Sequence, residues 1–226
     1  MEDFMKKLQL WKEQVKNLQK RIDEQLSLDN WKFIQGIENG ELPETDASKW
    51  DEKKNPVNWS MKSGTVYFRN LFTLPPDIEG IPTENSNINL TFLFPSGVEL
   101  FIDGEKVYAH KYWADKIATP FPLMQKAKRG EKHLIVFKTP QGDGYGTFWA
   151  KLSIDSAEDL LFELNSIFYQ LKFVCKLAEQ NNHLKKYAQK ALKVLNPRDI
   201  ENRNWNKVLG DIKKAEEILE VFIRYA

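Results

Sequence analysis

The spacing of hydrophobic residues predicts a helix at the start of the chain. Apolar residues there recur at alternating intervals of three and four, which is the a/d seam of a heptad repeat. This stripe fits either a coiled-coil dimer arm or one amphipathic helix that packs on its own chain. A seam of about three heptads is short for a free-standing coil, which favours the second interpretation. The stripe consists of Phe4, Leu8, Trp11, Val15, Leu18 and Ile22.

Helical spacing returns in three stripes after Ser156, a residue suited to an N-cap. Asn196-Pro197 is expected to end the second of these helices, because proline cannot continue one. Three amphipathic segments predict a helical hairpin or small bundle at the C-terminus. The stripes are Leu160, Leu164, Ile167, Leu171, Val174 and Ala178; then Leu184, Ala188, Ala191 and Leu195; then Trp205, Val208, Ile212, Ala215, Leu219 and Phe222.

Strand signals fill the middle of the chain. Asp103-Gly104 separates two β-rich runs, and this pair favours a type I′ hairpin turn, which needs positive φ at both positions. Arg129-Gly130 marks a second turn. Many short strands with turns at short intervals predict a β-sandwich. The predicted strands are residues 65–74, 89–94, 98–102, 105–109, 133–138 and 147–154.

Glycine and proline mark the same boundaries. All but one of the 11 glycines precede Asp155, and all but one of the 10 prolines lie between Pro43 and Pro140. Both residues punctuate short elements and are rare inside helices. We therefore predict an N-terminal amphipathic helix (residues 1–27), a β-sandwich (28–155) and a C-terminal helical segment (156–226), a mainly β fold with flanking α.

Charge and cysteine content limit the partners. The chain has 33 basic and 32 acidic residues, and no segment has the basic footprint of a nucleic-acid binder. Its apolar runs are far shorter than a membrane helix, and the N-terminus shows no secretory signal. A single cysteine, Cys175, leaves no internal disulfide framework. We expect a cytoplasmic protein with neither nucleic acid nor membrane as its partner.

Known catalytic patterns are missing from the sequence. None of His110, His133 and His183 has metal-ligand spacing, and Cys175 lies on an apolar helical stripe. The Gly-rich loop 142–146 leads into a strand, whereas a phosphate site needs a helix N-terminus. We expect no cofactor, no metal and no catalytic residue.

Two loops carry side chains suited to sugars, because aromatic faces stack on sugar rings while polar groups bind hydroxyls. Tyr108–Trp113 is the more suggestive loop, although it could instead cover the open end of the sandwich. The Gly-rich loop is either a plain turn or a second ligand contact. The candidate ligand-binding residues are His110, Tyr112, Trp113 and Asp115 in the first region, and Asp143, Tyr145 and Trp149 in the second.

Three segments carry motifs of a known protein family. Residues 66–75 (VYFRNLFTLP) resemble the W-F-R-x-x-F-x-x-P strand at the start of the jelly roll in family 38 α-mannosidases. Residues 97–105 resemble a strand and turn of galactose-binding-like jelly rolls, with Asp103 where asparagine is commoner. Residues 129–136 resemble the fold's G-x-n-x-L-x-V strand. The opening helix and the helices after Asp155 resemble the family's N-terminal helix and helical spacer, so the resemblance covers nearly the whole chain.

The resemblance implies a galactose-binding-like jelly-roll sandwich and a role beside an enzyme. The family's zinc and aspartate nucleophile belong to a domain that begins with an H-x-D signature, which this sequence lacks. No catalytic or metal residue can therefore be carried over. The implied function is a non-catalytic accessory module that binds carbohydrate, such as a mannoside, or supports a separate catalytic glycosidase chain. The alternative is a protein-interaction module that self-associates through its helices without binding sugar.

Overall fold

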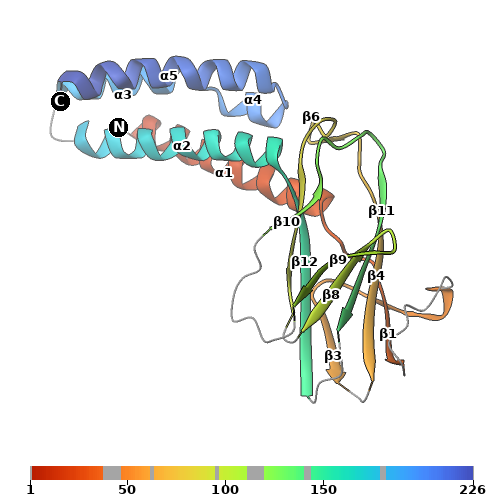
Figure 1. Ribbon diagram of the computed structural model, residues 1–226. Helices are drawn as coiled ribbons and strands as arrows, with labels where there is room; N and C mark the ends of the chain where they lie inside the picture. Colours follow the sequence, from red (N-terminus) through yellow and green to blue (C-terminus); the bar gives the residue numbers. More distant parts are fainter. Residues whose placement is uncertain are drawn as a thin grey trace. The chain divides into compact units, whose positions relative to one another are not determined.

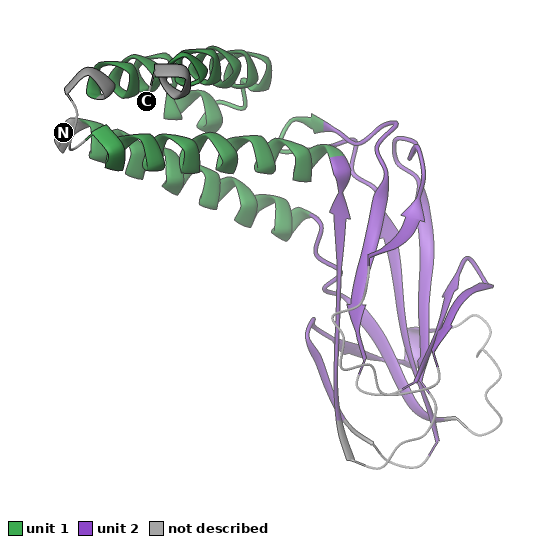
Figure 2. Ribbon diagram, turned by 60° about the vertical axis from the view of Figure 1, so that its left-hand side comes forward, with its two compact units in different colours: residues 1–25, 78–81, 156–226 green, residues 26–77, 82–155 purple. Residues whose placement is uncertain are grey.

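The computed structural model describes residues 2–37, 47–61, 64–94, 97–110, 120–139, 144–178 and 182–225. These residues form two compact units (Figures 1 and 2). Unit 1 contains residues 1–25, 78–81 and 156–226, and unit 2 contains residues 26–77 and 82–155. Helix accounts for 45% of the structure and strand for 35%, so the fold is mixed α/β. The prediction of a mainly β fold is wrong, because the long terminal helices outweigh many short strands.

Unit 2 is built from two antiparallel sheets. In the described residues, one sheet has the order β2 (Asp51–Lys53), β1 (Trp31–Ile37), β4 (Thr65–Thr73), β11 (Lys132–Thr139), β8 (Val98–Ile102), β9 (Glu105–His110). The other has the order β10 (Phe121–Met124), β7 (Ile88–Leu93), β12 (Gly144–Ile154), β3 (Val57–Met61). A 3-10 turn, Ala47–Lys49, precedes β2. The short strands β5 (Asp77–Ile78) and β6 (Ile81–Pro82) flank the turn at Glu79-Gly80.

Aromatic side chains from both sheets form the core of unit 2. Phe148 of β12 is fully buried, and its ring centroid lies 4.7 Å from that of Phe68 on β4 and 4.8 Å from that of Trp31 on β1. Phe92 of β7 lies 4.9 Å from Phe137 of β11. Since these pairs join strands of different sheets, the sheets pack face to face over an apolar interior, as alternating side chains on each strand allow.

The predicted strands are confirmed, and the Asp103-Gly104 hairpin is formed between β8 and β9. Asp103 has a φ of 53° and Gly104 a φ of 87°, which is the positive region that a type I′ turn requires. Gly130 has a φ of 72° in the second predicted turn. Strands β1, β2, β3, β5, β6 and β10 were not predicted.

Unit 1 contains α1 (Glu2–Gln25), α2 (Asp155–Ala178), α3 (Asn182–Val194), α4 (Pro197–Glu201) and α5 (Trp205–Tyr225). All six positions of the N-terminal heptad stripe are buried within the chain. Trp11 of α1 donates its indole N–H to the carbonyl of Leu164 on α2, at 3.1 Å. Helix α1 therefore packs on its own chain, as expected for a single amphipathic helix rather than for a coiled-coil dimer arm.

The described side chains of the C-terminal stripes are also buried, except that of Trp205, which is half-buried. The side chains of Leu184 and Phe222 lie outside the described residues. Helix α3 ends at Val194, as expected, but Pro197 also opens α4. Asn196 caps that helix by accepting the backbone N–H of Arg198. Proline suits a first helical turn, where its missing N–H would have no partner, so the same residue ends one helix and begins another.

Candidate functional site

The outward side of α2 carries a row of exposed aromatic residues. Phe162 is 71% exposed, and Tyr169 and Phe173 are each 63% exposed. Their spacing of seven and then four residues places them on one side of the helix. We call the row formed by Asp159, Phe162, Ser166, Tyr169, Phe173 and Lys176 the outer face of α2. Its end residues Asp159 and Lys176 are exposed and Ser166 is half-buried.

The opposite side of α2 holds the helix in unit 1. Leu164, Ile167 and Leu171 are fully buried there, and they alternate with the exposed positions at helical spacing. A helix that is apolar on both sides is usually covered on both. Contiguous exposed apolar side chains in turn mark surfaces that bind other molecules. The outer face is therefore the candidate functional site.

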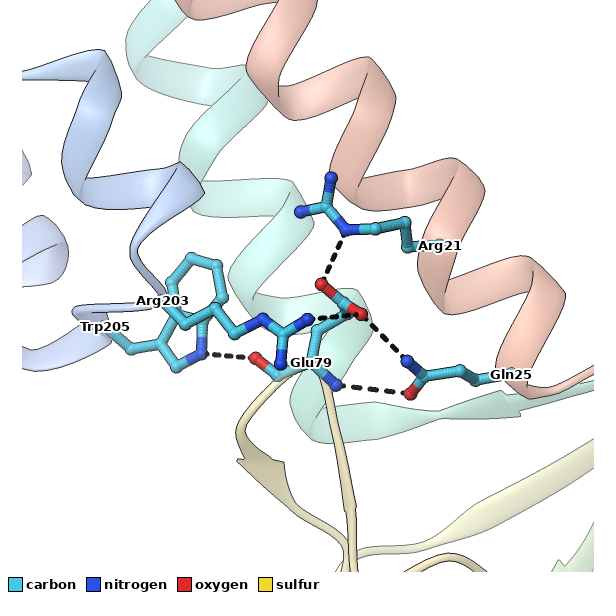
Figure 3. Close-up of polar contacts among 5 residues, drawn as sticks. All are labelled: Arg21, Gln25, Glu79, Arg203 and Trp205. Atoms are coloured by element: carbon cyan, nitrogen blue, oxygen red, sulfur yellow. Dashed lines mark hydrogen bonds and ion pairs between the residues drawn. The ribbon is translucent and has the colours of Figure 1, made fainter.

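A second polar site, around Glu79, organises unit 1 (Figure 3). The Glu79 side chain is 1% exposed and accepts the Nε–H of Arg21 at 2.6 Å, while Arg203 donates through Nη2 at 3.3 Å. Gln25 donates through Nε2 at 2.8 Å, and Trp205 donates its indole N–H to the Glu79 carbonyl at 2.9 Å. A buried carboxylate needs such partners to offset its desolvation.

The backbone at this site is also specialised. Glu79 has a φ of 55° and Gly80 a φ of 78°, so the chain turns sharply between β5 and β6. This turn directs Glu79 toward the end of α1 and the start of α5 (Figure 3). Because both carboxylate oxygens are held by cationic or amide donors, the group is committed to joining three segments of unit 1.

A third polar cluster lies at the β8–β9 turn. One Asp103 oxygen accepts the backbone N–H of Leu134 at 2.8 Å, and the other lies 2.7 Å from Nδ1 of His133. The His133 Nε2 lies 3.4 Å from Glu131. Burial raises the pKa of Asp103, but the Leu134 N–H and the His133 imidazole outweigh it, so that pKa lies below its usual range. These contacts fix the hairpin to β11.

The predicted ligand-binding residues are only partly described. His110 is exposed on β9 and Trp149 is half-buried on β12, so the two belong to different sheets. Tyr112, Trp113, Asp115 and Asp143 lie outside the described residues, as does the side chain of Tyr145. Their joint role in binding a ligand therefore stays a prediction.

Sequence reasoning missed both the outer face of α2 and the Glu79 site. The outer face had a signal, since Phe162, Tyr169 and Phe173 repeat at helical spacing beside the stripe that was recognised. The Glu79 site had none, because its partners are separated from it by 58 and 124 positions in the sequence.

Neither metal clusters nor membrane-spanning helices are found where the structure is described. Its histidine, cysteine and acidic side chains form no group of three that could hold a metal ion. No helix within the described ranges combines the length and hydrophobicity needed to cross a membrane.

No family model matches the sequence. No curated protein matches it either. Solved structures similar to this one include a family 2 glycosyl hydrolase from Bacteroides cellulosilyticus (18% identity, 54% of this chain, 20% of that chain, TM-score 0.39). They also include a β-glucuronidase from Faecalibacterium prausnitzii (19% identity, 51% of this chain, 20% of that chain, TM-score 0.41). A third is a putative β-galactosidase from Bacteroides fragilis (19% identity, 57% of this chain, 23% of that chain, TM-score 0.42).

The chain spans only about a fifth of the length of these three solved glycosidase chains, between 20% and 23%. At these scores, none of the similarities assigns the chain to a family. The resemblance to family 38 α-mannosidases also stays a prediction, since the structures named above are family 2 or other glycosidase chains.

Proposed function

We propose that this protein is a non-catalytic accessory module, related to glycoside hydrolases, that docks a catalytic glycosidase chain through the outer face of α2. The observation that carries the docking role is the exposure of Phe162, Tyr169 and Phe173 on one side of a helix whose other side is already buried. The relation to glycosidases rests on the sequence motifs in unit 2. We place the protein in the cytoplasm, where a chain with one cysteine needs no disulfide.

The apolar area on the outer face supplies a large part of the free energy that docking needs. An aromatic side chain presents roughly 200 Å² to solvent, and about two-thirds of each ring in this row is exposed, so the three rings offer roughly 400 Å². At about 25 cal/mol per Å², covering them contributes on the order of 10 kcal/mol before the costs of association. Those costs are about 4–15 kcal/mol, so docking needs further polar contacts around the row.

The buried carboxylate of Glu79 and the exposed carboxylate of Asp103 already have structural partners. Glu79 is held by two guanidinium groups, and Asp103 by a backbone N–H and an imidazole. A general base must instead be able to reach and accept a substrate proton. That both carboxylates are already engaged favours a non-catalytic role for the module over acid–base chemistry at either of them.

The test is a pull-down with three baits: the wild-type chain, Phe173→Asp, and Leu10→Asp. Leu10 is 42% exposed on α1 and serves as the matched control for placing a charge on an exposed apolar position. Mass spectrometry should identify a glycosidase catalytic chain with the wild-type and Leu10→Asp baits, and not with Phe173→Asp. Recovery of the same chains with all three baits, or no glycosidase with any, contradicts the proposal.

Carbohydrate binding is the second candidate function, and one surface of unit 2 favours it. Phe148 and Ala150 of β12 are fully buried, so Thr147 and Trp149 point to the outside of the four-stranded sheet. The Thr147 hydroxyl donates to the Asn58 side-chain oxygen at 2.8 Å beside this tryptophan. A half-exposed indole next to hydroxyl and amide groups suits a sugar ring.

We accordingly propose a galactose-binding-like jelly roll for unit 2, with mannosides as the first ligands to titrate. Trp149→Ala should abolish any ligand-induced change in tryptophan fluorescence, while Leu71→Ala, at a 67% exposed position of β4, should leave it unchanged. A chain whose fluorescence does not respond to any mannoside refutes this second function.

A further inference from the structure

The outer face of α2 has a heptad pattern of its own. Its six residues follow one another at intervals of three, four, three, four and three, which is the a/d spacing of a coiled-coil seam. The buried stripe of α2 lies on the opposite side and is satisfied within unit 1. The seam therefore faces outward with a periodicity that another helix could match.

We infer that this seam pairs with the same seam of a second copy of the chain, with the two α2 helices antiparallel. The inference rests on the proposed function, since it adds a second occupant of the same docking face: a copy of the chain pairs there when no glycosidase chain is bound. In such a pair Phe162 lies opposite Phe173 of the other copy, and Ser166 lies opposite Tyr169. The phenylalanines then meet each other in the second and fifth layers, and Tyr169 meets the small Ser166 in the two central layers, so that large and small side chains together fill the space.

Charge selects the antiparallel direction. Asp159 and Lys176 are both exposed and occupy the two ends of the seam. In an antiparallel pair each Asp159 meets Lys176 of the other copy, so both ends gain an ion pair. In a parallel pair Asp159 would meet Asp159 and Lys176 would meet Lys176, and like charges at facing positions repel.

The short length of the seam limits the affinity expected between the two copies. Six layers over about 17 residues span roughly 25 Å at 1.5 Å per residue, which gives a contact at the small end of stable interfaces. Only three of the six residues are aromatic. We expect a reversible dimer with a dissociation constant on the order of 10 μM, which corresponds to a transient assembly.

Sedimentation equilibrium of the full chain tests the pairing. Wild type should pass from a 26.5 kDa monomer to a dimer as its concentration rises. Asp159→Lys and Lys176→Asp should each weaken the dimer by about tenfold at low salt, because each replaces two attractive contacts with two repulsive ones. The double variant Asp159→Lys/Lys176→Asp should restore wild-type affinity. Lys190→Asp, an exposed charge reversal on α3, is the matched control and should change nothing.

The result separates this inference from the proposed function. A chain that stays monomeric up to about 500 μM overturns self-pairing, as does a dimer that neither single reversal weakens. Phe173→Asp should also give a monomer, and its far-UV circular dichroism and thermal midpoint must match those of Leu10→Asp for that result to count. If the chain is monomeric while the Phe173→Asp bait still loses a glycosidase chain, self-pairing is refuted and the docking function stands.

Discussion

Gly146 lies directly against the Trp59 ring in unit 2, and a single methyl group there should destabilise the protein. Gly146 lies opposite Trp59 in the β12–β3 ladder. A Cβ on Gly146 would lie closest to Cζ2 of the Trp59 ring, 2.5 Å from Cε2 and 2.7 Å from Cη2. Favourable carbon–carbon contacts begin near 3.5 Å, so in Gly146→Ala the indole would have to move by about 1 Å.

The indole has little room for that movement. Trp59 is 5% exposed, and its ring centroid lies 5.0 Å from that of Phe68 and 6.5 Å from that of Phe94. Forcing a side chain into a packed core of this kind costs about 1–3 kcal/mol. The φ of Gly146 lies outside the left-handed region, so alanine itself causes no backbone strain and should recover about 0.5 kcal/mol by restricting the unfolded chain. We expect Gly146→Ala to lose about 1–2 kcal/mol.

Urea unfolding of the full chain measures this loss, with tryptophan fluorescence as the readout. The midpoint should fall for Gly146→Ala, and the loss should shrink when Trp59 is first replaced by leucine, since the smaller side chain makes room for the methyl group. Equal or greater stability of Gly146→Ala in the wild-type background refutes the reasoning. So does a loss of the same size in the Trp59→Leu background, because it would place the cause elsewhere.

Three further changes should give results of different sign and form. Gly210→Ala in α5, where an added Cβ meets nothing within 4 Å, should raise the free energy of unfolding by about 1 kcal/mol in a urea titration followed at 222 nm. Glu79→Ala should lower it by about 2–4 kcal/mol, because Arg21 and Gln25 lose a buried partner; an unchanged 222 nm midpoint contradicts the role of that site. Asp103→Asn tests pH dependence: since the folded pKa of Asp103 is lowered, the wild-type carboxylate stabilises the fold above pH about 4, and this advantage over the variant should disappear as pH falls through the folded pKa. Thermal midpoints of wild type and Asp103→Asn between pH 6 and pH 2 check this, and a constant difference between them refutes it.

Local patterns in the sequence predicted the elements whose causes are local. The Asp103-Gly104 turn depends on the conformations of two residues, and both have the positive φ expected. The heptad stripe of α1 was recognisable because helical periodicity needs only the neighbouring residues. Strand β1 has buried Trp31 and Phe33 on alternate positions, but Gly36 interrupts its β-rich run and it was not predicted.

What could not be predicted depends on distant residues or on two roles for one residue. Pro197 ends one helix and opens the next, and a stop signal alone does not show the second role. Nothing near Glu79 indicates that it is buried, because its arginine partners come from α1 and from the turn before α5. The sugar-binding candidates depend on how loops of different sheets meet, and most of those loops lie outside the described residues.

Unit 1 combines segments that lie far apart in the sequence, and this separation has a consequence during synthesis on the ribosome. Helix α1 is translated before the other helices of unit 1, and its partners in α2, α3 and α4 come at least 130 residues later. Translation at about 5–20 residues per second leaves the apolar side of α1 without these partners for roughly 6–25 s. During that interval the six buried residues of its stripe are available to chaperones or to other nascent chains. Placing α1 after α5 by circular permutation would remove the delay, so the permuted chain should give a higher soluble yield at the same expression rate.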